Sequence, residues 1–205
     1  QKTLMEQFGL TAQQASDLVA KGFQSGLNSS DDFLDTIGEY SNLFAAGGAD
    51  AAQFFSLIQS GMGSGVLGTD KAADAFKEFG IRIRELPDNV FGPDGLLLNG
   101  LDMSSEQVSA LFNGLQDGSV SVADAFNTIM PALQNVDNEV WRNTAGVALF
   151  GTQWEDLGPV IAANMSMGTT SLNDMAGATD SLNAKYNNWG SLWEGFKRQA
   201  LDALQ

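Results

Sequence analysis

The feature that most limits the fold of this 205-residue chain is a short helical unit, broken by glycine, that occurs three times. Each unit reads as an amphipathic helix, a glycine that stops it, and a second helix that follows a polar capping residue. The units lie at residues 16–37, 55–80 and 109–129. Units of this kind predict helical hairpins. A repeated hairpin with no chemical group fixed inside it indicates a scaffold rather than a catalyst.

Apolar residues recur with the period of a helix along most of the chain. The clearest sets are Phe33, Ile37, Tyr40 and Phe44, then Val108, Leu111, Phe112 and Leu115, and then Val122, Phe126, Ile129 and Leu133. No alternation of period two is of comparable length. The best strand candidate runs from Ile81 to Arg84, and it could equally end the preceding helix. The fold class is therefore expected to be all-α, an irregular bundle of short helical hairpins with a long C-terminal helix.

Local capping signals support these helices. A capping residue is followed three positions later by a second polar side chain, so that both can bond the free N–H groups of a first turn. The pairs are Thr11 with Gln14, Asp50 with Gln53, Ser104 with Gln107, Ser121 with Asp124, and Ser171 with Asp174. Glycines stand where helices are expected to end. These are Gly26, Gly47, Gly48, Gly80 and Gly118.

Turn-forming residues divide the chain into four expected regions. A first hairpin region covers residues 1–85, and a turn-rich connection with two prolines covers 86–103. A second hairpin region covers 104–168, and a long amphipathic helix covers 169–205. Within the connection, the apolar run from Leu96 to Leu98 is expected to dock on the core.

The last region carries a heptad pattern, which we call the heptad seam. Its apolar positions step by three and four residues for more than four heptads, as in a coiled coil. The residues that define it are Leu172, Met175, Leu182, Tyr186, Trp189, Trp193 and Phe196. Two interpretations remain open: the helix packs on its own domain, or it forms a coiled coil with copies of itself. Gly190 and Gly195 count against a pure rod, since each costs about 1 kcal/mol of helix propensity.

Composition excludes several classes of function. The chain contains no histidine and no cysteine, which excludes thiol chemistry, disulfides and Cys/His zinc sites within it. Its formal net charge is −15, and Arg142 is the only basic residue between Glu85 and Ala184. Direct contact with nucleic acid is therefore not expected, because such contact needs clustered Lys and Arg. No apolar run is long enough to span a membrane. Both ends lie in helical sequence, so we expect a fragment of a longer chain.

Three local patterns resemble functional sites but fit structural roles better. Glu155 and Asp156 are neighbours that point to different sides of a helix, and they suit a first helical turn. The acidic residues at 31–35 lack the spacing of a calcium loop. The glycines at 61–65 lack the lysine and the preceding strand of a phosphate-binding loop. No catalytic, cofactor-binding or metal site is therefore predicted, and no cofactor.

Three longer stretches together resemble the tail tape measure proteins of long-tailed bacteriophages and prophages. The stretches are residues 30–44, 68–82 and 146–159. The third is the most specific, because its order of Gly, Phe, Trp and Pro is unlikely by chance. The resemblance spans about residues 12–193.

This resemblance implies a structural virion protein that acts in tail assembly, tail-length determination and DNA ejection. It implies a place in the virion tail after assembly in the host cytoplasm. Tail tube, tail-assembly chaperone and tail-tip proteins are the implied partners, and a few identical copies would suit the heptad seam. The family supplies no catalytic residue to place on this chain, and we expect no enzyme. The alternative function is a generic α-helical adaptor.

Overall fold

The computed structural model describes residues 1–66, 68–168, 171–181 and 184. In this part of the chain every regular element is a helix, which confirms the all-α fold class. The helices are α1 (Lys2–Phe8), α2 (Ala12–Gln24), α3 (Phe33–Ala46), α4 (Ala51–Gly63), α5 (Thr69–Arg84), α6 (Asp88–Phe91), α7 (Leu96–Asn99), α8 (Ser105–Asp117), α9 (Val122–Gln134), α10 (Glu139–Phe150), α11 (Thr152–Leu157), α12 (Pro159–Asn164) and the 3-10 helix η1 (Leu172–Met175).

The predicted capping pairs form as expected. In α2, α4, α8 and α9 the capping side chain accepts the backbone N–H three residues on, and the side chain at that position accepts the capping residue's own N–H. Before η1, the Asp174 carboxylate accepts the Ser171 N–H at 2.8 Å. Each cap satisfies first-turn donors that have no partner inside the helix. Local sequence therefore sets where these helices begin.

The three glycine-broken units are α2–α3, α4–α5 and α8–α9. Their connections contain Gly26, Gly65 and Gly118 with positive φ, a conformation that favours glycine. Gly80 is an exception, because the expectation that it ends a helix is wrong. It lies inside α5, where a side chain would stand 3.3 Å from Val122 of α9. Its role is to let two helices approach, and the stretch to Arg84 is accordingly helical rather than extended.

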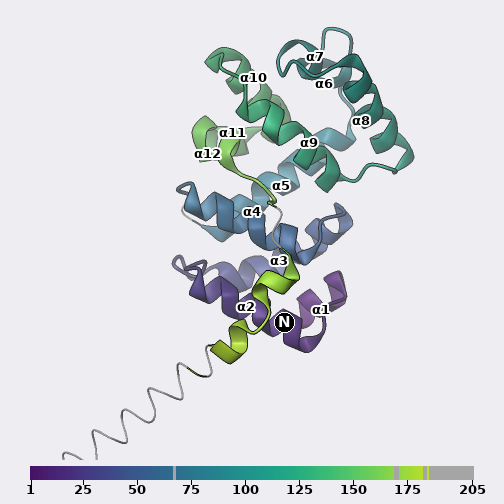
Figure 1. The fold of residues 1–205 in the computed structure, drawn as a ribbon. Helices are drawn as coiled ribbons and strands as arrows, with labels where there is room; N and C mark the ends of the chain where they lie inside the picture. The colour runs from purple at the N-terminus through teal and green to yellow at the C-terminus, as the bar shows by residue number, and fades with distance from the viewer. Residues whose placement is uncertain (67, 169–170, 182–183, 185–205) are drawn as a thin grey trace, which may run out of the picture.

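The helices stack into an elongated column with α5 near its middle (Figure 1). The stack begins with α1 and α2, continues through α3 and α4, and ends where α6 to α10 gather. Buried phenylalanine rings run through its core. Phe76 of α5 lies 4.3 Å from Phe44 of α3 and 5.7 Å from Phe126 of α9 between ring centroids. Phe79 continues the contact to Phe150 of α10 at 5.5 Å. The long helix α5 therefore joins the two halves.

The turn-rich connection packs against the second half. Leu96 and Leu97 are buried, which confirms that this apolar run docks on the core. Phe91 of α6 lies 5.7 Å from Phe112 of α8 between ring centroids. One cluster of buried apolar side chains extends from Leu4 to Met175 and passes through all four sequence regions.

The stretch at 146–159 has a packing role. The ring of Trp154 in α11 is buried and occupies the space beside Gly146 of α10, where a Cβ would lie 1.9 Å from it. The Trp154 indole N–H donates to the Asn143 side chain at 3.3 Å. Gly158, with φ 73°, then reverses the chain, and Pro159 starts α12. The glycines, tryptophan and proline of this stretch therefore form one tight corner, and the stacking of Phe150 on Trp154 at 6.1 Å between ring centroids accounts for the phenylalanine.

Candidate functional site

The structure describes the first two residues of the heptad seam. Leu172 and Met175 lie in η1, and Met175 is buried in the core cluster. The chain then turns at Gly177, with φ 77°, and is helical again from Ala178 to Ser181. The helix expected over this region is thus interrupted at its beginning. Leu182, Tyr186, Trp189, Trp193 and Phe196 lie outside the described residues.

The start of this last helix is fixed by α2, far away in sequence. The carboxylate of Asp17 is buried and accepts the backbone N–H of Gly177 at 3.1 Å and that of Thr179 at 2.9 Å. A hydrogen bond from Gln24 to the Ala178 carbonyl, at 3.1 Å, adds a second link. A carboxylate at a helix N-terminus is favoured by the helix dipole and by the free N–H groups. Asp17 therefore caps this helix from another part of the fold.

The hydrogen bonds that the Asp17 carboxylate accepts stabilise its ionised form. The Thr179 N–H lowers the pKa of Asp17 most, burial opposes this effect, and bonds from Gly177 and Gln13 lower it further. The ionised form is therefore the one that the folded protein stabilises.

A return segment (residues 165–168 and 171–181) connects α12 to this cap along the side of the column (Figure 1). Met165 and Met167 are buried in the core cluster. The hydroxyl of Ser60 in α4 donates to the Ser166 carbonyl at 2.9 Å and accepts the Ser166 N–H at 3.0 Å. These contacts bind the segment that leads to the heptad seam to the first half of the column.

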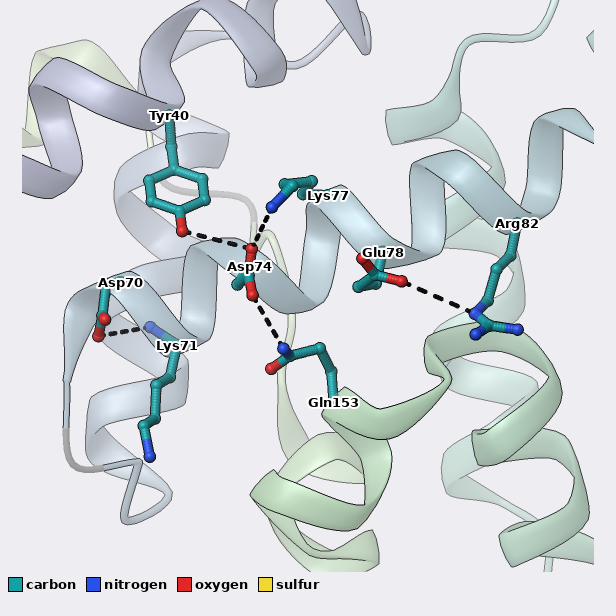
Figure 2. A network of polar contacts seen from close by, with 8 residues as sticks. All are labelled: Tyr40, Asp70, Lys71, Asp74, Lys77, Glu78, Arg82 and Gln153. Carbon is teal, nitrogen blue, oxygen red and sulfur yellow. Dashed lines mark hydrogen bonds and ion pairs between the residues drawn. The ribbon is translucent and has the colours of Figure 1, made fainter.

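A polar network crosses the middle of the column (Figure 2). Asp74 of α5 is its centre and accepts hydrogen bonds from three sides. The Tyr40 hydroxyl of α3 donates at 3.3 Å, the Lys77 ammonium at 2.8 Å, and the Gln153 side-chain amide of α11 at 2.8 Å. One carboxylate thus links three helices that are separated in sequence.

The electrostatics of this network do not suit acid–base chemistry. Burial and the Asp74 charge raise the pKa of Tyr40, and the hydrogen bond to Asp74 raises the pKa of Lys77. A general acid or base works best with a pKa near the operating pH, and both shifts lead away from neutrality. The network therefore holds helices together and keeps Tyr40 and Lys77 protonated.

The chain matches the model of the phage-related minor tail protein family over residues 2–151. It belongs to this family. No curated protein and no solved structure matches it. The match begins with α1 and ends at Gly151, directly after α10, so it covers the column from one end to the other. As a member of this family, the chain is a structural component of a phage tail.

The residues whose patterns resembled chemical sites have structural roles in the fold. Glu155 lies in the first turn of α11. Asp32 accepts the Ser30 hydroxyl at 2.6 Å and the Asp70 N–H at 3.3 Å, at the start of α5. Burial raises the pKa of Asp32, but these bonds together lower it. No group of three or more His, Cys, Asp or Glu in the described residues could hold a metal ion.

The glycines at 61–65 are partly helical, because α4 continues to Gly63 before the chain turns. No helix in the described part of the chain has the length and apolarity needed to cross a membrane.

Sequence reasoning missed Asp17 and Asp74, which link helices that are far apart in the sequence. Asp17 precedes Leu18, a buried residue of α2, and a charge beside an apolar face is a weak hint of a buried partner. The spacing of Asp74 and Lys77 allows their local ion pair, but the other two partners of Asp74 lie 34 and 79 residues away, which no local pattern shows.

Proposed function

We propose that this chain is a segment of a tape measure protein that acts in tail assembly, tail-length determination and DNA ejection. The resemblance of three stretches to tape measure proteins motivates the proposal, and membership of a tail protein family supports it. Its partners are the tail tube, tail-assembly chaperone and tail-tip proteins. It acts through helical packing, and copies associate through the heptad seam.

The main structural support for a folded segment of a tape measure protein is the column of packed helices. A ruler made of continuous helix advances about 1.5 Å per residue, so 150 residues would span about 225 Å. The described helices instead fold back on one another, and α5, the longest of those given, has 16 residues. The segment is therefore a compact module beside the extended part of the ruler.

The acidity of the segment suits a protein that shares the tail with DNA. Only Arg142 is basic between Glu85 and Ala184. A surface without clustered cations gains nothing from counterion release on a phosphate backbone, so this part of the chain does not hold passing DNA.

The test is an in-frame deletion of the codons for residues 2–151 in the phage genome, with tails measured by electron microscopy. Missing tails, tails of irregular length, or tails shortened by much less than about 225 Å support a folded module of the ruler. Tails of unchanged length on fully infectious particles would refute the tape measure role. A shortening close to the full helical length would refute the folded module.

A further inference from the structure

The far end of the column contains an open recess of about 480 Å³. It lies between the loop before α8, the end of α9 and the start of α10. Its lining includes Asp102, Met103, Val136, Asp137 and Trp141. The helices that line it, α8 to α10, gather at the opposite end of the column from α2, where Gly177 of the return segment docks (Figure 1).

Hydrogen bonds to the backbone hold the walls of this recess in place. The Asn138 side chain caps α10 by accepting the Val140 N–H at 3.0 Å and the Trp141 N–H at 3.2 Å. On the opposite side, the Met103 N–H donates to the Leu97 carbonyl at 2.9 Å. Asp102 has a positive φ of 53°, a strained conformation for a residue with a side chain. The two walls of the recess are therefore fixed by the fold itself, before any partner binds.

α10, which begins at the recess, exposes three apolar side chains that we call the ridge, and the exposed Thr144 lies between two of them. Trp141 is 44% exposed, Val140 is 74% exposed and Val147 is 43% exposed. Val140 and Val147 are seven residues apart, about 10 Å along the helix. Gly100 lies against the Trp141 ring, so this aromatic side chain is supported on one side and open on the other. A supported, exposed tryptophan is a common anchor of protein interfaces.

The acidic charge of this half of the chain favours a basic partner. Between Glu85 and Ala184 the sequence has twelve acidic residues and one basic residue. Asp102 and Asp137 line the recess, and both side chains are exposed. The single cation, Arg142, is half-buried and donates to the Val136 carbonyl at 3.4 Å.

We infer that this recess and ridge bind a basic, amphipathic segment of another protein. A lysine or arginine of the partner enters the recess near Asp102, Asp137 and Trp141, where carboxylates and an aromatic ring both attract a cation. Apolar side chains of the same segment cover Val140 and Val147. Nucleic acid and anionic lipid are repelled by the same charges. The inference does not depend on the tape measure role.

The test uses the full chain labelled with 5-fluorotryptophan and followed by ¹⁹F NMR, with the Trp141 signal assigned by Trp141→Phe. The probe is a synthetic amphipathic peptide of lysine and leucine without tryptophan. Its matched control replaces every lysine with glutamate. Asp102→Asn with Asp137→Asn removes the recess charges, and Asp94→Asn with Glu155→Gln removes two exposed charges elsewhere.

The lysine peptide is expected to shift the Trp141 signal saturably, and the glutamate peptide is not. Loss of the two recess charges should weaken binding about three- to tenfold, the effect of two exposed ion pairs, while the control pair changes it less than twofold. Equal weakening by both variant pairs, or no shift of Trp141, would overturn the proposal. The proposal would also be overturned if tetramethylammonium alone bound as tightly as the lysine peptide, because the ridge would then contribute nothing to the affinity.

Discussion

Substituting Gly146 by alanine tests the corner that explains the 146–159 stretch. Inside α10, alanine gains about 1 kcal/mol of helix propensity over glycine. Its Cβ, however, would lie 1.9 Å from the buried ring of Trp154. Displacing a buried tryptophan costs about 3–5 kcal/mol, the usual loss on truncating one. The net expectation is a destabilisation of about 2–4 kcal/mol, the difference between these two effects.

The assay is urea unfolding followed by far-UV circular dichroism, compared as free energies of unfolding. Gly38→Ala is the matched control, since Gly38 lies inside α3 with nothing within 4 Å of an added Cβ. It should stabilise by about 1 kcal/mol. In a Trp154→Ala background, Gly146→Ala should also stabilise by about 1 kcal/mol, because the ring is gone. If Gly146→Ala destabilises equally in both backgrounds, the steric explanation is wrong.

Three further predictions concern the polar contacts and the heptad seam. Because the folded pKa of Asp17 is lowered, its stabilisation is present above the unfolded pKa of about 3.9 and is lost as pH falls through the folded pKa. Hydrogen-exchange protection of the Thr179 amide should fall over that range, and Asp17→Asn should remove this pH dependence; a dependence that persists contradicts the cap. Asp74→Ala should lower the free energy of unfolding by about 1–3 kcal/mol, since three donors lose their acceptor; an unchanged urea midpoint would show that the network contributes no stability. Trp189→Ser with Trp193→Ser should convert a self-associated chain to monomer in sedimentation equilibrium, and a monomeric unmodified chain would exclude the coiled coil under those conditions.

Local features of the fold could be predicted from the sequence because their causes are local. A capping residue and its partner are three positions apart, so the starts of α2, α4, α8 and α9 follow from adjacent residues. The apolar face of α3 was equally visible, and its predicted residues are all buried. They are Phe33, Ile37, Tyr40 and Phe44.

Contacts between distant residues could not be predicted in this way. Gly80 has the sequence character of a helix stop, but its environment is set by α9, 42 residues away at Val122. The cap that Asp17 places on Thr179 spans 162 residues and depends on where the return segment lies. Exposure of Trp141 depends likewise on the arrangement of α7 to α10. The helical spacing of apolar residues does not show which helix faces remain exposed to solvent.

A pair of introduced cysteines tests most directly whether this chain is a folded module in the assembled tail. The hydroxyls of Thr36 and Thr69 lie 2.8 Å apart in the core, 33 residues apart in sequence, and the chain has no cysteine of its own. In purified virions carrying Thr36→Cys and Thr69→Cys, mild oxidation should form the intramolecular disulfide, detected by mass spectrometry of tryptic peptides. In a continuous helix the two positions would be about 50 Å apart. Two free thiols in intact tails, with the disulfide forming in the isolated chain, would contradict the account.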